Sequence, residues 1–159
     1  KDFGITHCGA HAMDTMRMES GFLHWGHDIS PEENQYEAGL NFAINYKKEI
    51  DFIGKESLLN IKDKIQNKRF IMLSLIDSKP GNPLLLHEEP IYLKDRIIGR
   101  TTSGNYSFNY NKNLSFGYIT SGYSNEDLAN KKLYIEVAKE KYPAIIEQQP
   151  LKSKKIRFS

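Results

Sequence analysis

The sequence is poor in cysteine, in long hydrophobic runs and in excess charge, and each shortage excludes a class of protein. Cys8 is the only cysteine of the 159 residues, so no disulfide can form within the chain and nothing indicates an oxidising compartment. No apolar stretch approaches the roughly 20 residues that a membrane-spanning helix needs, and no signal-peptide pattern is present. We therefore expect a cytoplasmic protein with no membrane partner.

The charges nearly balance, with 22 lysines and arginines against 20 aspartates and glutamates, for a formal net charge of +2. A nucleic-acid-binding surface needs a basic stripe, so we expect no nucleic-acid partner. The composition, 39% hydrophobic and 11% aromatic, is that of a globular protein. The chain begins at Lys1 within a stretch that has the pattern of structured sequence, and we expect a fragment of a longer protein.

The first third of the sequence predicts short, separate elements. Residues 8–20 favour a helix, because Ala12 and Met16 lie four positions apart, as do Met13 and Arg17, and Gly21 is a suitable C-terminal stop. Residues 21–30 have no helical period and predict a strand or an irregular segment. The alternation in residues 40–46 predicts a half-buried strand, and residues 55–64 have the apolar spacing of a helix.

The rest of the sequence is rich in β-branched and aromatic residues. Five such runs are separated by Gly, Pro, Asn and Lys-Asp turns, and they cover residues 68–76, 90–104, 114–121, 132–138 and 142–150. Short strands at this spacing predict an antiparallel barrel. The predicted fold class is α+β: the end of a mixed α/β domain over residues 1–66, followed by a small antiparallel β-barrel over residues 67–159.

One hairpin of the predicted barrel has an unusual composition. Gly104 and the Asn-rich segment after it predict a loop between two strands. The aromatic residues Tyr106, Phe108 and Tyr110 also have the character of a stacking platform for single-stranded nucleic acid. The balanced charge favours a plain hairpin connection over that alternative.

The sequence contains few catalytic or metal-binding signatures. It has no Walker-type glycine loop and no nucleophile elbow, and Cys8 has no visible activating partner. His7 and His11 lie four positions apart, which is a metal-ligand spacing on a helix. Gly4 and Gly9 argue against a continuous helix through His7, and no carboxylate stands at a matching position, so we expect no metal site.

Arg17 and Glu19 stand out at the end of the predicted helix of residues 8–20. Because they are two residues apart, their side chains lie about 200 degrees apart around a helix. They are therefore expected to contact different parts of the protein. A glutamate in the last turn opposes the helix dipole, which favours cations at that end. The residues alone leave two interpretations of Glu19 open: surface charge at a helix end, or a carboxylate held for a ligand or another domain.

Three stretches together resemble the aminomethyltransferase (glycine cleavage T-protein) family. Residues 14–58 are similar to its pattern D-x-L-R-L-E-x-G … G-x-D … E-A-G-L … F-I-G-x-x-A-L. Residues 97–119 look like the hairpin of the family's C-terminal barrel. Residues 141–151, KYPAIIEQQPL, are similar to the last strands of the dimethylglycine and sarcosine dehydrogenases.

The resemblance implies a role in one-carbon transfer. In these dehydrogenases an N-terminal FAD domain oxidises an N-methyl amine to an iminium, and a C-terminal module captures the one-carbon unit on tetrahydrofolate. The chain would then supply the later part of that folate-binding module. Its partners would be tetrahydrofolate and an FAD domain upstream in the same protein. The family's catalytic aspartate would lie upstream too, so we expect no catalytic residue here.

The resemblance also implies five binding residues. Glu19 matches the motif glutamate that accepts hydrogen bonds from the amino-pyrimidinone edge of the pteridine. Arg17 matches the motif arginine, with the expected role of pinning the segment that follows. Lys48 is the nearest match to a basic residue that helps to hold folate, and Trp25 and Tyr36 are expected to line the pocket.

Two alternatives remain open at this point. The chain can be part of a true aminomethyltransferase of the glycine cleavage system, with a lipoyl carrier protein as partner and no flavin. It can also be a barrel used only for folding or protein contact, without a ligand. The "KYPAIIEQQP" ending favours the dehydrogenase.

Overall fold

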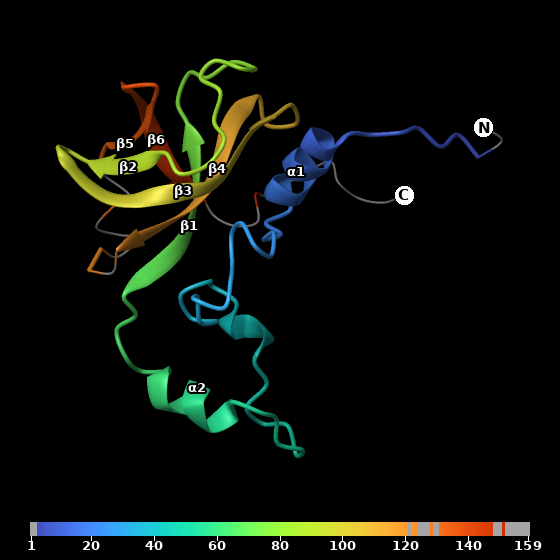
Figure 1. The fold of residues 1–159 in the computed structure, drawn as a ribbon, viewed down its shortest axis with the longest axis vertical. Helices are drawn as coiled ribbons and strands as arrows, with labels where there is room; N and C mark the ends of the chain where they lie inside the picture. Colours follow the sequence, from blue (N-terminus) through green and yellow to red (C-terminus); the bar gives the residue numbers. More distant parts are fainter. Residues whose placement is uncertain (1–2, 121, 124–127, 129–130, 148–150, 152–159) are drawn as a thin grey trace.

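The computed structural model describes residues 3–120, 122–123, 128, 131–147 and 151. Figure 1 shows a β-barrel with helix α1 (Ala10–Glu19) beside it. Residues 30–67, here called the arm, extend away from the barrel and carry helix α2 (Lys55–Ile61). The arm returns to the barrel at its first strand.

The described residues form a closed barrel of six antiparallel strands in the order β1-β4-β3-β2-β5-β6. The strands are β1 (Lys68–Leu75), β2 (Pro90–Leu93), β3 (Arg96–Ser107), β4 (Lys112–Thr120), β5 (Leu133–Val137) and β6 (Glu140–Glu147). This architecture confirms the α+β fold with a small antiparallel barrel.

The barrel core follows the alternation in the sequence. In β5, Leu133 and Ile135 are buried, whereas Tyr134 and Glu136 between them are only partly buried. Neighbouring strands add further apolar side chains to the same core, among them Ile71, Leu73, Ile91, Ile98 and Ile119. Burial of this apolar surface is the main stabilising contribution to the barrel.

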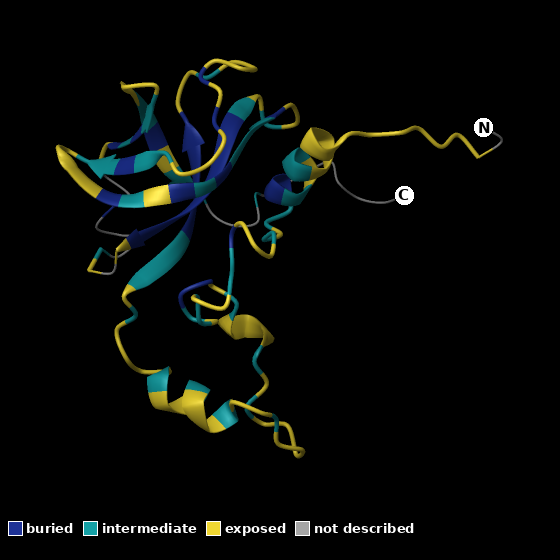
Figure 2. Ribbon diagram, viewed as in Figure 1, coloured by how far each residue is buried: buried dark blue, intermediate teal, exposed yellow. Residues whose placement is uncertain are grey.

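The arm has almost no core of its own. Most of it is exposed in Figure 2, and Phe42, Ile50 and Ile53 are exposed apolar side chains on it. The predicted strand over residues 40–46 is wrong, because a 3-10 helix, η1 (Asn41–Ala43), lies there. A strand needs a hydrogen-bonded neighbour, and no described strand pairs with this segment.

The two predicted helices are present, each shorter than expected. Helix α1 ends where Gly21 takes a positive φ of 76°, and the Phe22 amide donates to the Arg17 carbonyl at 2.8 Å. Glycine takes this left-handed conformation without the cost that a side chain would add. The segment after α1 is made of turns with one isolated bridge between Trp25 and Ile29, which matches the irregular alternative.

The loop predicted from Gly104 lies further along the chain. Residues 108–111 connect β3 to β4, and Gly104 lies inside β3. A Cβ at Gly104 would come 2.5 Å from Cβ of Leu85. Glycine is therefore needed there for close packing, and not for a turn.

A charged group ties three barrel strands together. The Lys112 ammonium of β4 donates to the Glu147 carboxylate of β6 at 2.7 Å, and the Ser74 hydroxyl of β1 donates to the same oxygen at 2.6 Å. Burial alone would raise the pKa of Glu147, but the hydrogen bonds from Lys112 and Ser74 outweigh it and lower the pKa below its ordinary value of 4.5.

We expect this contact to make the barrel sensitive to acid. A carboxyl group whose pKa is lower in the folded state stabilises the fold above its unfolded pKa, and this contribution is lost as the pH falls through the folded-state pKa. The melting temperature of Glu147→Gln should therefore fall less than that of the wild type between about pH 5 and pH 3. Glu49→Gln, at an exposed position, is the control. Parallel melting profiles of wild type and Glu147→Gln would contradict the assignment.

Candidate functional site

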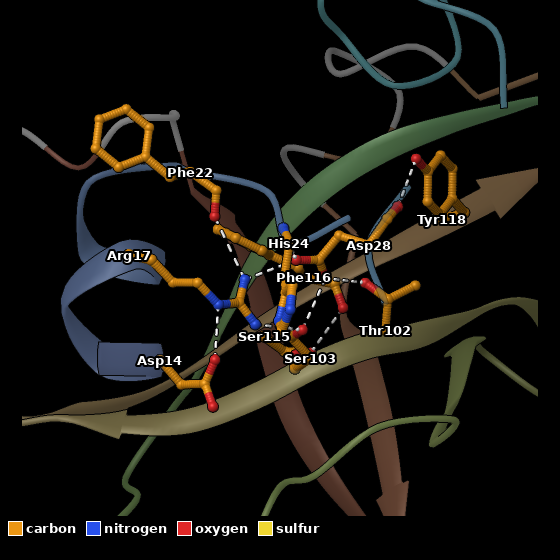
Figure 3. A network of polar contacts seen from close by, with 10 residues as sticks. All are labelled: Asp14, Arg17, Phe22, His24, Asp28, Thr102, Ser103, Ser115, Phe116 and Tyr118. Atoms are coloured by element: carbon orange, nitrogen blue, oxygen red, sulfur yellow. Dashed lines mark hydrogen bonds and ion pairs between the residues drawn. The ribbon is translucent and has the colours of Figure 1, made fainter. Parts of the chain in front are cut away.

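Arg17 attaches α1 to both the following segment and the barrel (Figure 3). Its Nε donates to Asp14 at 2.7 Å and its Nη1 donates to Asp28 at 2.6 Å. Its Nη2 donates to the Ser103 hydroxyl of β3 at 2.9 Å. The Phe22 carbonyl also accepts from Nη1 at 3.3 Å. These contacts join Arg17 to Phe22 and Asp28 in the segment that follows it and to Ser103 in β3.

Asp28 is the centre of this polar network. Its side chain is 0% exposed, and besides Arg17 it accepts hydrogen bonds from the His24 amide at 2.8 Å, the Thr102 hydroxyl at 2.6 Å and the Ser103 hydroxyl at 2.7 Å. The Tyr118 hydroxyl donates to the Asp28 carbonyl at 2.9 Å. A buried carboxylate is tolerated only when it is paired and hydrogen-bonded, and these donors meet that condition. Residues 22–28 are thereby fixed to β3 and β4.

Glu19 lies at the C-terminal end of α1, against the β3–β4 hairpin. It is 2% exposed. The Ser107 hydroxyl donates to its Oε1 at 2.5 Å, and the Asn109 side-chain amide donates to its Oε2 at 2.6 Å. Hydrogen bonds to a charged group are stronger than neutral ones, so these two offset the unfavourable position of a carboxylate at this end of a helix.

The other three predicted site residues lie outside this network. Trp25 is 65% exposed, and Lys48 is exposed in the arm. The Tyr36 hydroxyl bonds to the Tyr46 hydroxyl and donates to the Leu58 carbonyl at 3.4 Å, so its contacts also belong to the arm. Among the described residues, Arg17 and Glu19 contact the barrel, whereas no hydrogen bond or ion pair joins Tyr36 or Lys48 to either of them.

The sequence reasoning missed the partners of the two motif residues. Asp28 could have been found from the sequence, because Gly26-His27-Asp28 matches the G-x-D part of the family pattern. Ser107 and Asn109 lie in the stretch that resembles the barrel hairpin, but they are 88 and 90 residues from Glu19. Nothing local in the sequence indicates that pairing.

A cavity of about 190 Å³ lies next to the Arg17 network. Its walls come from α1, the turn after it, the loop before β2 and strand β3, and four histidines line it: His11, His24, His27 and His87. Pockets for small molecules usually span about 300–1,000 Å³, so it is too small for a folate. The described residues contain no group of three histidines, cysteines or acidic residues arranged to hold a metal ion.

Two family models match the chain. The glycine cleavage T-protein C-terminal barrel domain matches residues 68–152, and the GCVT N-terminal domain matches residues 1–48. The chain belongs to the glycine cleavage T-protein family. The barrel and the segment that carries Arg17 and Glu19 each fall within one of these matches.

The relatives of this T-protein family member include two kinds of enzyme. Human mitochondrial dimethylglycine dehydrogenase is 36% identical over 151 residues, which cover 93% of this chain and 16% of that protein. The aminomethyltransferase of Listeria welshimeri is 33% identical over 147 residues, which cover 92% of this chain and 39% of that protein. The chain thus spans only a minor part of the curated relatives that it matches.

A solved structure shows the same fold. The crystal structure of the glycine cleavage system aminomethyltransferase from Bartonella henselae superimposes with a TM-score of 0.73 at 19% identity, covering 87% of this chain and 37% of that chain. Among the described residues, no helix has the length and apolar character to cross a membrane. The human and rat dehydrogenases are named as mitochondrial, and the cytoplasmic location of this chain stays a prediction.

We expect Asp28→Asn to detach residues 22–28 from the barrel. The substitution removes the charge that pairs with Arg17 and leaves the guanidinium half-satisfied, which costs about 3–4 kcal/mol in a buried pair. Urea unfolding measures the loss, and amide hydrogen exchange should quicken at His24, whose amide donates to Asp28.

The matched control is Asp51→Asn. Asp51 pairs with Lys55, but its side chain is 82% exposed, so its loss should cost less than about 1 kcal/mol. Equal losses for the two substitutions would show that Asp28 is not the anchor of the segment.

Proposed function

We propose that this chain is the later part of a folate-binding module in a flavin-dependent N-methyl amine dehydrogenase of the dimethylglycine or sarcosine type. The observation that carries the proposal is the Glu19 carboxylate, buried at the end of α1 and oriented by the barrel. Similarity to dimethylglycine dehydrogenase over 93% of the chain supports the dehydrogenase as the parent protein.

The donor and acceptor chemistry of Glu19 suits a pteridine. A carboxylate has about four lone-pair positions, and Ser107 and Asn109 occupy one on each oxygen. In the proposed complex, each oxygen accepts one of the two parallel N–H donors of an amino-pyrimidinone edge. Bound tetrahydrofolate would accept the one-carbon unit, while Glu19 would bind and orient its ring.

The remaining residues have supporting roles in this proposal. Arg17 positions the segment and does not touch the ligand, because its donors already bond to Asp14, Asp28 and Ser103. Trp25 and Lys48 are exposed and available to a ligand, whereas the Tyr36 hydroxyl is engaged within the arm.

A second candidate is part of an aminomethyltransferase that works with a lipoyl carrier protein and without flavin. The similarity to the Listeria welshimeri enzyme over 92% of the chain favours it. The coding sequence upstream separates the two. A G-x-G-x-x-G motif that opens a βαβ unit supports an FAD domain and hence the dehydrogenase. A parent gene that begins directly with the folate module would exclude it.

A third candidate is a barrel module that binds no ligand. The observation in its favour is that Arg17 and Glu19 both have partners within the chain. Folate binding by the parent protein distinguishes this candidate from the other two.

We expect Glu19→Gln in the full-length protein to weaken tetrahydrofolate binding by about 1.5–3 kcal/mol, because an amide cannot accept both donors of the pteridine edge. Calorimetric titration measures the change, and a thermal melt checks that the variant folds. Glu32→Gln, at an exposed position, is the control and should bind as the wild type does. Equal affinity of Glu19→Gln and wild type would rule out the role of Glu19, and no binding by either would favour the ligand-free barrel.

We also expect the 159 residues alone to show no turnover and weak or no tetrahydrofolate binding. The exposed apolar side chains of the arm, such as Phe42 and Ile53, have no partner surface among the described residues, as expected if the upstream part of the module covers them. Titration of the isolated chain beside the full-length protein tests this. Equal affinity of the two would contradict it.

A further inference from the structure

The two donors that hold Glu19 differ in their exposure. Ser107 is 0% exposed and is the last residue of β3. Asn109 is exposed in the four-residue loop between β3 and β4. One oxygen of the carboxylate is therefore held from the barrel interior and the other from the molecular surface.

The Ser107 contact is fixed by the hairpin itself. The Tyr110 amide donates to the Ser107 hydroxyl oxygen at 3.1 Å, while the Ser107 hydroxyl donates to Glu19. A hydroxyl group has one hydrogen, and here the Tyr110 amide supplies the hydrogen bond to a lone pair of its oxygen. Its hydrogen is thereby directed at Oε1 of Glu19, and the plane of the carboxylate is set from this side.

The Asn109 contact is of another kind. Its side-chain amide is an N–H donor of the same chemistry as the amino group of a pteridine, and it already occupies Oε2 of Glu19 at 2.6 Å. Glu19 is 2% exposed, so a ring cannot lie in its plane while all of its neighbours stay in place. Of the two described residues that donate to Glu19, Asn109 is exposed and Ser107 is buried, so Asn109 is the one whose side chain can turn into solvent.

We propose that Asn109 is a gate on the folate site, which caps Glu19 in the free protein and swings away when the pteridine binds, while Ser107 stays as the fixed positioning residue. This inference rests on the proposed function, in which Glu19 binds the ring. The ligand then replaces a hydrogen bond of equivalent chemistry, so the carboxylate is never left unpaired in the buried site.

The test is tetrahydrofolate binding by the full-length protein, measured at equilibrium and by stopped-flow mixing. Asn109→Ala removes the competing donor and should lower the dissociation constant about three- to tenfold, mainly through faster association, since one hydrogen bond contributes about that much. Ser107→Ala should raise the dissociation constant. In a Glu19→Gln background, Asn109→Ala should change nothing, because the two residues act on one group.

The control is Asp95→Ala, which removes an exposed polar side chain from the β2–β3 turn of the same barrel. A residue with only a structural role would lower the melting temperature on removal but would not tighten binding. Unchanged or weaker binding by Asn109→Ala, with Glu19→Gln still impaired, would overturn the gate and leave the proposed function intact. Unimpaired binding by Glu19→Gln would overturn both.

Discussion

The hydrogen bonds to the buried carboxylate of Asp28 are the constraint on which the rest of the site depends. Its side chain is 0% exposed and accepts from Arg17, from the barrel hydroxyls and from a backbone amide of its own turn. Because an unpaired charge at this depth costs several kcal/mol, the donors can only be satisfied together. Helix α1 and the turn after it therefore dock onto strand β3 together. This docking places Glu19 against the β3–β4 hairpin.

The two buried carboxylates, Asp28 and Glu19, differ in the number of donors that contact them. Asp28 has donors on both oxygens from a helix, a turn and a strand, which leaves it as a structural anchor. Among the described residues, Glu19 has one donor on each oxygen, one from a buried residue and one from an exposed residue. In the proposed function, the same chemical group serves the fold at Asp28 and recognition at Glu19, and the difference lies in how many donors contact each carboxylate.

The sequence predicted those features that local pattern determines. The period-two alternation around Leu133 and Ile135 predicted strand β5, and Gly21 predicted the end of α1. Both predictions rest on residues that lie within a few positions of each other. The strand expected at residues 40–46 failed because alternation describes one face and does not provide a pairing partner. The contacts of Glu19 with Ser107 and Asn109 join segments about 90 residues apart, and no local signal could predict them. The resemblance to the T-protein family pointed to Glu19 and Arg17 as site residues, but it did not indicate their hydrogen-bond partners.

The most direct test of the account is a crystal structure of the full-length protein with tetrahydrofolate bound. The account predicts that both oxygens of Glu19 accept hydrogen bonds from the amino-pyrimidinone edge at about 2.8 Å, while the Ser107 hydroxyl and the Asp28 network stay as they are. A pteridine bound elsewhere, with Glu19 still bonded only to Ser107 and Asn109, would contradict it.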